Sequence, residues 1–519
     1  MRKMTERLVG KLRLDIAIEK EAKSTRNLVP PEIGWDRIVD NLPTLQSWII
    51  SQLRAGFTPG GQQVIAVRKA QGTRPLPIWG AVERIIYRAL TDLVLGGEFK
   101  LDRSADAYLA FIKAPVRYSE RLQRESRKSQ GTDNLFFFLQ SDIEYVVKSD
   151  ITAFYQYVDH AVLGQELQAR GGDFDAISHL LELLREVQGR AYGLPQLLDS
   201  SDELSEIYID RVERQLLRHG LAVWRFNDDF RIACRTYHDA LNSIEQLDAA
   251  ARDVGLVISE SKTLTFRFMN YMFDSLSLNR EPGMDGVLLD DVEAVVGDYT
   301  DDFSEDLEAA KSCIHGAQAT DVVDEGLDLR KVNTDNLRLL RRALGSLTHA
   351  ADAGVTEDIL RLFIYAPALS PTLFQYLSSV YLIAQDRVTA VIDEMINHAS
   401  MNEWQHQWVL RTIHDLKLLR EGALGQLDNR ITWVKNKRLE SSSAMTGAYA
   451  TLALSAVRRI EFDQVMRSLE AAPSALLTWY AAALREHYEV EREPELKRRL
   501  DAVASMSPLH KALVEDASS

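Results

Sequence analysis

The stretch LAVWRFNDDFRIACRTY, residues 221–237, decides which fold the rest of the sequence must fit. Apolar and polar residues alternate on both sides of its central FNDDF, and a period of two is typical of β-strands. A short polar step between two such runs predicts a β-hairpin with Asp228 and Asp229 at its tip. Because Asp is also favoured in ordinary tight turns, the pair is either a simple turn or part of a metal site.

The composition is that of a globular protein. The chain has 519 residues, 46% hydrophobic and 26% charged, which suggests about two to four domains. No apolar run reaches the roughly 18 residues of a membrane helix, and the charged N-terminus lacks a signal-peptide core. The two cysteines, Cys234 and Cys313, lack the spacing of a disulfide framework or zinc cluster. We therefore expect a protein of a reducing cytoplasm, with no membrane partner.

Charge is distributed unevenly along the chain. The net charge is −15, yet residues 1–280 carry 37 basic and 38 acidic residues, so the excess acid lies in the second half. Residues 281–310 contain eleven acidic and no basic residues. In the first half, KAPVRYSERLQRESRK (113–128) has six cations and two anions, which indicates either a solvated helix face or a phosphate-binding surface.

The periodicity of the sequence predicts three regions. Residues 1–50 form a helical N-terminal extension, and residues 51–280 mix strand and helix patterns. Residues 281–519 are helix-periodic almost throughout, with breaks at Gly, Pro or Asn. The helices of this last region have no clean fixed period, so any repeat is degenerate.

A second candidate carboxylate follows another predicted strand. IEYVVKSDI (143–151) predicts a buried strand that ends near Asp150, with a helix after it. Asp150 could simply cap that helix. A carboxylate at a strand end can also face a cleft, and Mg²⁺ is typically held by a few carboxylates together with substrate phosphates. Asp150 and Asp228 would meet if their strands were neighbours in one sheet.

Five segments are similar, in the same order, to the motifs of reverse transcriptases. They are VRKAQGTRPLPI (67–78), VVKSDITAFYQYVDH (146–160), GLPQLLDSSDELSEIYID (193–210), RFNDDF (225–230) and VGLVISESKT (254–263). Any one of them could arise by chance, but the ordered set makes a simple turn at Asp228 a poor explanation. The resemblance implies an α+β fold with the palm and fingers of a right-hand-type polymerase, followed by an all-α helical-repeat domain.

The wording of DITAFYQYVDH (150–160) most resembles the bacterial abortive-infection and defence-associated reverse transcriptases. Members of that group join a polymerase-like domain to C-terminal helical repeats, as the strand-poor second half suggests here. The resemblance implies bacterial anti-phage defence by DNA synthesis, which in this group can be untemplated and primed from a protein hydroxyl. It also implies dNTPs as substrates, a DNA product, an RNA template in some members, and a homo-oligomer. The phage trigger and the priming residue cannot be identified from the sequence.

The resemblance assigns a role to each motif residue. Asp150 and Asp228 would bridge two Mg²⁺ ions (Mn²⁺ being a possible substitute), with Asp229 as a weaker ligand and the carbonyl of Ile151 completing one coordination sphere. Lys262 would protonate the departing pyrophosphate. The residues expected to bind the nucleotide are Arg68, Lys69 and Arg74 at the triphosphate, Tyr155 as the gate that excludes a 2′-hydroxyl, and Gln196 near the base.

Two departures from the family pattern leave other functions open. Leu197 replaces the glycine expected after Gln196, and Phe226 replaces the usual tyrosine of the hairpin, with Asn227 at its small position. Neither change removes a metal-binding carboxylate, but both affect template handling. The alternatives are RNA-templated cDNA synthesis on one dedicated RNA, and a catalytically silent nucleic-acid-binding scaffold.

Overall fold

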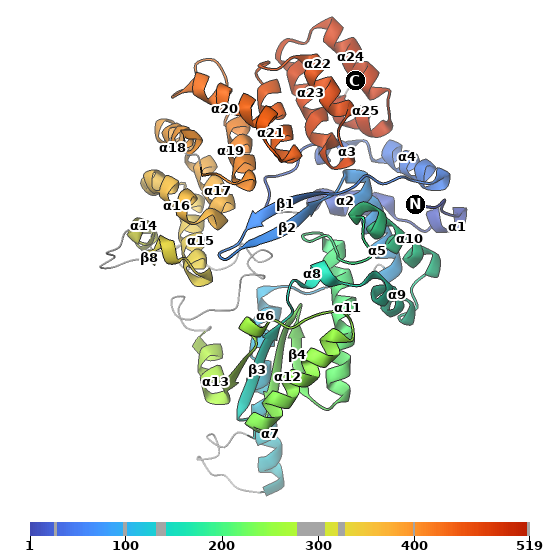
Figure 1. The fold of residues 1–519 in the computed structure, drawn as a ribbon, viewed down its shortest axis with the longest axis vertical. Helices are drawn as coiled ribbons and strands as arrows, with labels where there is room; N and C mark the ends of the chain where they lie inside the picture. Colours follow the sequence, from blue (N-terminus) through green and yellow to red (C-terminus); the bar gives the residue numbers. More distant parts are fainter. Residues whose placement is uncertain are drawn as a thin grey trace. The chain divides into compact units, whose positions relative to one another are not determined.

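The computed structural model describes residues 1–24, 28–96, 101–130, 142–277, 307–319, 327–397 and 400–515. The chain divides into two compact units (Figure 1), one formed by Met1–Ala89 with Thr300–Ser519 and the other by Leu90–Tyr299. Among the described residues, no helix is both long enough and apolar enough to cross a membrane.

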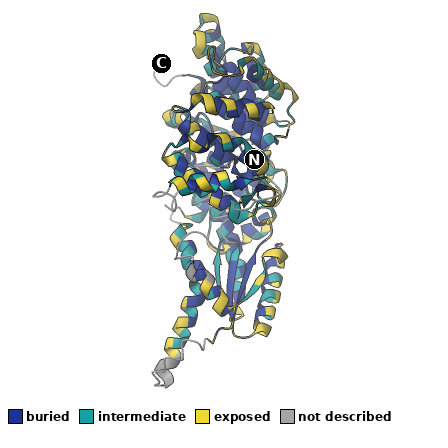
Figure 2. Ribbon diagram, turned by 90° about the vertical axis from the view of Figure 1, so that its left-hand side faces the viewer, coloured by how far each residue is buried: buried dark blue, intermediate teal, exposed yellow. Residues whose placement is uncertain are grey.

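The unit Leu90–Tyr299 is built on a four-stranded sheet with the strand order β4-β5-β3-β6. Its strands are β3 (Tyr145–Asp150), β4 (Ala222–Phe226), β5 (Asp229–Cys234) and β6 (Leu264–Arg267). All neighbouring strands are antiparallel. β4 and β5 form the hairpin predicted from residues 221–237, with Asn227 and Asp228 as its two-residue turn. The two central strands, β3 and β5, are buried along almost their whole length (Figure 2).

Helices cover both faces of this sheet. The helices of this unit are α6 (Ala105–Ile112), α7 (Ala114–Gln130), α8 (Phe154–Tyr157), α9 (His160–Ala169), α10 (Phe174–Gln188), α11 (Asp199–Arg218), α12 (Tyr237–Arg252) and α13 (Phe268–Ser277), of which α9 packs on α11 and α10 packs on α9. On one face, Val146 and Ala233 pack against Val116 of α7 and Tyr271 of α13. On the other face, Cys234 of β5 contacts Ser243 of α12, with their Sγ and Oγ atoms 3.6 Å apart.

The helix predicted directly after Asp150 begins later and in two pieces. Residues 151–153 form a bridge and a turn, so Asp150 ends a strand and caps no helix. α8 then stops at Tyr157, and Asp159 starts α9 by accepting hydrogen bonds from the backbone N–H groups of Ala161 and Val162. A side chain that satisfies two free N–H groups stabilises the start of a helix. The new helix therefore starts at Asp159, although the helical pattern of the sequence continues across this position.

The second unit combines both ends of the chain. Its N-terminal elements are α1 (Glu6–Val9), α2 (Leu14–Lys23), α3 (Trp35–Asp40), α4 (Leu42–Ala55), β1 (Gln63–Arg68), β2 (Thr73–Ile78) and the first part of α5 (Ala81–Leu95). Its C-terminal helices are α14 (Leu307–Gly316), α15 (Thr334–His349), α16 (Ile359–Tyr365), α17 (Ser370–Val380), α18 (Gln385–Asn397), α19 (Glu403–Asp415), α20 (Leu427–Glu440), α21 (Ala444–Ser455), α22 (Phe462–Glu470), α23 (Leu477–Glu491), α24 (Pro494–Ala504) and α25 (Pro508–Val514). The described residues from 307 onward add to these helices a few short 3-10 turns and two two-residue strands, β7 (Ala317–Gln318) and β8 (Leu327–Asp328).

Side chains of the C-terminal helices bind backbone carbonyls of the N-terminal segment. The indole of Trp404 donates to the carbonyl of Leu28 at 2.6 Å, and the hydroxyl of Tyr449 donates to that of Pro30 at 3.3 Å. Residues 51–89 also belong to the compact unit that contains these helices. The predicted boundary at residue 280 and the acidic residues 281–306 fall outside the described residues, so that boundary and the helical-repeat assignment stay predictions.

We predict that Arg84→Met destabilises this unit strongly. Arg84 is buried and pairs with Glu21 at 2.7 Å and Glu32 at 2.5 Å. Removing the guanidinium leaves these carboxylates without their partner, a change that typically costs about 3–5 kcal/mol. The measurement is the urea midpoint followed by circular dichroism. Arg54→Met breaks only the exposed pair with Glu6 and should cost at most about 1 kcal/mol; equal losses in the two variants would contradict the prediction.

Candidate functional site

The predicted carboxylates meet at one end of the four-stranded sheet. The antiparallel register of β3 and β5 places Asp150 directly opposite Asp229. The residues beside this pair, Ile151 after Asp150 and Asp228 before Asp229, are also joined, because the N–H of Ile151 donates to the carbonyl of Asp228 at 3.3 Å. Asp150, Ile151, Asp228 and Asp229 thus form one cluster, although they come from segments 78 positions apart in the sequence.

Cations lie beside these carboxylates on the same face of the sheet. Because side chains alternate between faces along a strand, Lys148 shares the face of Asp150, and its cross-strand partner Arg231 shares the face of Asp229. Arg231 is fully buried and lies 3.7 Å from Asp229. Burial, assisted by the neighbouring Arg231 charge, lowers the pKa of Lys148 to about 8. The cations offset the repulsion expected between carboxylates placed opposite one another.

Lys262 contacts Asp150 directly. Its Nζ lies 3.0 Å from a carboxylate oxygen of Asp150, while its side chain remains 53% exposed. The segment that carries it runs beside the end of β3: the N–H of Ser259 donates to the Asp150 carbonyl at 2.7 Å, and that of Thr152 donates to the Val257 carbonyl at 2.8 Å. The structure therefore brings Lys262 into the predicted site, and its role as an acid stays a prediction.

The donor set suits a hard divalent cation. Carboxylate and carbonyl oxygens are the ligands that Mg²⁺ takes in proteins, usually few in number and completed by substrate phosphates. Within the described parts of the chain, however, no group of three or more Asp, Glu, His or Cys side chains is arranged to hold a metal ion.

The GLPQ loop is joined to the segment after Asp150 by its backbone. The N–H of Gly193 donates to the carbonyl of Val158, and that of Leu194 to the carbonyl of Tyr155, both at 2.7 Å. The Gly193 carbonyl accepts from the imidazole of His160 at 2.7 Å. Gly193 has φ +91°, and a Cβ there would lie 3.2 Å from a backbone oxygen, so this position requires glycine.

Gln196 and Leu197 form the turn at the end of this loop. Gln196 is half-buried, and its Oε1 makes no hydrogen bond with any described residue. Leu197 has φ +62°, a left-handed conformation that glycine adopts freely and other residues at a cost of about 1–2 kcal/mol. Leu197 therefore has the left-handed backbone conformation that would suit the glycine expected at this position.

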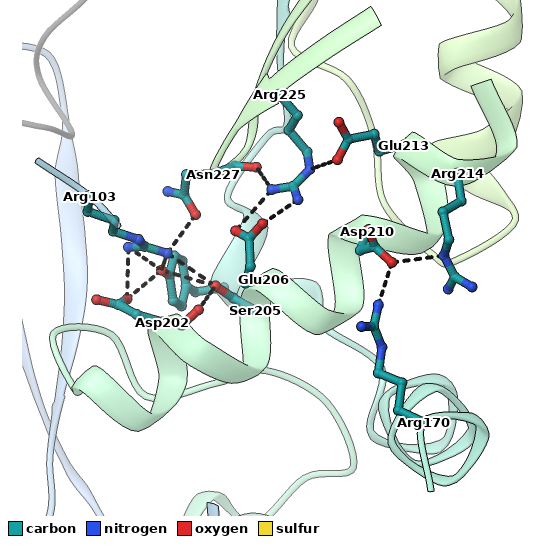
Figure 3. Close-up of polar contacts among 11 residues, drawn as sticks. Arg103, Arg170, Asp202, Ser205, Glu206, Asp210, Glu213, Arg214, Arg225 and Asn227 are labelled. Carbon is teal, nitrogen blue, oxygen red and sulfur yellow. Dashed lines mark hydrogen bonds and ion pairs between the residues drawn. The ribbon is translucent and has the colours of Figure 1, made fainter. Parts of the chain in front are cut away.

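Tyr155 lies on α8, and its hydroxyl belongs to a polar cluster with Arg103, Asp202 and Ser205, which are labelled in Figure 3. The hydroxyl donates to Asp202 of α11 at 2.5 Å and accepts from the guanidinium of Arg103 at 3.2 Å and from Ser205 at 3.3 Å. Burial and the Asp202 charge raise the pKa of Tyr155 well above its usual value, so the phenol stays protonated. Its neighbour Phe154 is the fully buried core aromatic of this helix.

The sequence motifs did not single out Arg103 or Asp202. Arg103 also donates to the side-chain oxygen of Asn227 at 3.0 Å and pairs with Asp202 at 3.1 Å. Asp202 lies within the GLPQ motif but between the positions that match the family pattern. The signal in the sequence was weak, since an arginine before the helix start Ser104 is unremarkable until its partners are known.

Phe226 and the hairpin are held by separate contacts. The ring of Phe226 packs against Tyr108 and Phe111 of α6, with centroids 5.2 and 5.9 Å away. A tyrosine hydroxyl is therefore not needed to fix this residue. Arg225 ties β4 to α11 through Glu206 and through Glu213 at 3.0 Å (Figure 3).

The three cations predicted at the triphosphate lie in the other compact unit. Arg68 and Arg74 belong to the antiparallel strands β1 and β2, and Lys69 follows β1. Arg68 and Lys69 are exposed, whereas Arg74 is half-buried. The segment 67–78 thus spans the end of β1, a turn and β2, and nucleotide binding by these residues stays a prediction.

Comparison with known proteins identifies the class of the domain. Residues 111–295 match the family described as reverse transcriptase (RNA-dependent DNA polymerase). No curated protein sequence matches the chain. The chain therefore carries a reverse transcriptase domain, the domain of RNA-directed DNA polymerases, as its motifs predicted.

Solved structures of telomerase are similar only at a low level. Telomerase from Candida albicans, solved with a fragment of telomeric RNA, matches at 11% identity and a TM-score of 0.30, over 67% of this chain and 64% of its own. Apo telomerase from Candida tropicalis matches at 10% identity and a TM-score of 0.31, over 85% of this chain and 72% of its own. The chain thus spans less than two thirds of the length of the first of these proteins.

We predict an unusual order of stability at Leu197. Leu197→Gly and Leu197→Ala both remove the apolar side chain, but only glycine relieves the left-handed backbone. The glycine variant should therefore be more stable than the alanine variant by about 1 kcal/mol, measured by urea unfolding. At an exposed helical position such as Leu217, the alanine variant should instead be more stable than the glycine variant. If the glycine variant were the more stable at both positions, the result would contradict backbone strain at Leu197.

Proposed function

We propose that this protein is a divalent-metal-dependent DNA polymerase of the reverse transcriptase class that acts in bacterial anti-phage defence. The observation that carries the polymerase part is the register of Asp150 against Asp229, with Asp228 beside them, inside the region that matches the reverse transcriptase family. The defence role rests on the resemblance of residues 150–160 and of the helical second half. We also propose that the protein forms a homo-oligomer. The acidic second half would make protein–protein contacts, because its negative charge disfavours binding to a phosphate backbone.

In this proposal the reaction is nucleotidyl transfer. A hydroxyl loses its proton to solvent and attacks the α-phosphorus of a dNTP; a new P–O bond forms, the bond from the α-phosphorus to the bridging oxygen breaks, and pyrophosphate leaves. Asp150, Asp228, Asp229 and the carbonyl of Ile151 would hold Mg²⁺, or Mn²⁺ in its place. When bound, the metal supplies charge neutralisation at the attacking and leaving oxygens. The protein otherwise acts mainly by positioning groups and neutralising charge.

The remaining side chains orient the substrates and move one proton. Lys262 would donate its Nζ proton to the departing pyrophosphate. Arg74, with Arg68 and Lys69, would bind the triphosphate, since a guanidinium matches phosphate oxygens. Gln196 would contact the incoming nucleotide through its amide oxygen, which is buried.

Two other functions are distinguished by one experiment. Purified protein is incubated with each labelled dNTP, with and without RNA, and the products are run on denaturing gels before and after protease. Protein-linked DNA made without RNA would support untemplated, protein-primed synthesis. Product that requires RNA would favour cDNA synthesis on a dedicated template. The absence of any product with either metal would favour the catalytically silent scaffold. The three clustered aspartates argue against a scaffold, because a scaffold has no chemical need for them.

We predict that Asp150→Asn and Asp228→Asn each reduce incorporation by more than about 100-fold. Even residues that only support metal ligands are typically worth about 10–100-fold, and these two are proposed as ligands. The isosteric amide preserves the fold, which circular dichroism should verify. Asp175→Asn, an exposed acid in the first turn of α10, is the matched control and should keep wild-type activity. Full activity in both site variants would refute the polymerase proposal.

We further predict that Tyr155→Ala admits ribonucleotides. If the Tyr155 ring excludes the 2′-hydroxyl, its removal should lower the preference for dNTPs over rNTPs by about tenfold or more, measured as the ratio of kcat/KM values. Tyr157→Ala, two residues along α8 and 52% exposed, should leave the ratio unchanged. An unaltered ratio in Tyr155→Ala would assign Tyr155 to the core.

A further inference from the structure

Arg103 occupies a fixed position at the start of α6. Its neighbour Ser104 caps this helix by accepting from the N–H of Ala107 at 3.2 Å, and Asp102 accepts from the N–H of Ser104 at 2.9 Å. These two contacts hold the backbone on both sides of Arg103. The side chain is only 13% exposed, so its guanidinium is directed into the protein.

The guanidinium of Arg103 joins three other segments of the unit Leu90–Tyr299 (Figure 3). It donates to the hydroxyl of Tyr155 on α8 at 3.2 Å, pairs with Asp202 on α11 at 3.1 Å, and donates to the side-chain oxygen of Asn227 in the hairpin turn at 3.0 Å. A planar guanidinium has several donors in fixed directions, which a lysine lacks. One side chain can therefore fix the mutual positions of all three segments.

Two of these contacts lie next to residues of the proposed site. Tyr155 follows Asp150 by five residues, and Asn227 precedes Asp228 directly. Asn227 has φ +54°, a left-handed conformation that needs support from its surroundings even though Asn tolerates it better than most residues. The Tyr155 ring, held at its hydroxyl by Arg103, Asp202 and Ser205, cannot rotate away without breaking these bonds.

We propose that Arg103 is a positioning residue for sugar selection: it fixes the Tyr155 ring and the Asn227 turn relative to each other. The proposal rests on the polymerase function proposed above and extends it to a residue outside the family motifs. Arg103 acts through Tyr155 and through the turn that carries Asp228. Its loss should therefore relax the discrimination against ribonucleotides and weaken nucleotide binding more than it slows the chemical step.

The test separates this role from a purely structural one. Arg103→Met alone would leave the half-buried carboxylate of Asp202 without its cation and could unfold the domain, so Arg103→Met is combined with Asp202→Asn. In the double variant we expect the kcat/KM ratio of dGTP to GTP to fall about tenfold, with a larger change in KM than in kcat. Arg103→Lys keeps the charge beside Asp202 and should restore the melting temperature, but not the ratio, because a single ammonium cannot reach all three partners.

Arg170→Met provides the matched control. Arg170 also pairs with α11, through Asp210 (Figure 3), and touches neither Tyr155 nor Asn227 in the described contacts. Its removal should leave the nucleotide ratio unchanged. If the wild type incorporates dNTPs and the folded double variant keeps the wild-type ratio, this inference alone fails. If the wild type incorporates no nucleotide, the proposed function fails, and the inference is overturned with it.

Discussion

Antiparallel pairing of β3 with β5 sets Asp150 opposite Asp229 and Lys148 opposite Arg231. A shift of one residue would turn every side chain of β3 to the opposite face of the sheet. Asp150 and Lys148 would then leave the face on which Asp229 and Arg231 lie, so the carboxylates of Asp150 and Asp229 would no longer lie opposite one another. Register is strongly specified here because β3 and β5 are buried along almost their whole length, so the core of the sheet and the charges of the site depend on the same pairing.

Several backbone positions around this pairing are strained. Three non-glycine residues with positive φ, Ala153, Leu197 and Asn227, lie after β3, in the GLPQ loop and in the hairpin turn. Such conformations cost about 1–3 kcal/mol each and persist where surrounding contacts enforce them. Here the enforcing contacts include hydrogen bonds from the GLPQ loop to the carbonyls after β3 and ion pairs from Arg103 and Arg225 to α11. The free energy gained by packing the core thus offsets the unfavourable backbone conformations in the loops of the site.

The second unit shows what sequence periodicity misses. Helical patterns predicted helices at both ends of the chain, and both sets are present. Periodicity did not reveal that residues 1–89 and the C-terminal helices share one compact unit, because the contacts that join them include backbone carbonyls. Those of Leu28 and Pro30 accept from Trp404 and Tyr449, and any residue type offers the same acceptor.

Sequence alone determined the hairpin at 221–237, the strand that ends at Asp150 and the order of the motifs. Each is encoded locally, by a period of two or by turn residues. Tertiary structure decided that Asp150 lies opposite Asp229, that Lys262 pairs with Asp150, and that the Tyr155 hydroxyl is held by Arg103 and Asp202. These contacts join residues far apart in the chain, and their energy depends on burial and distance, which no local pattern of residues specifies.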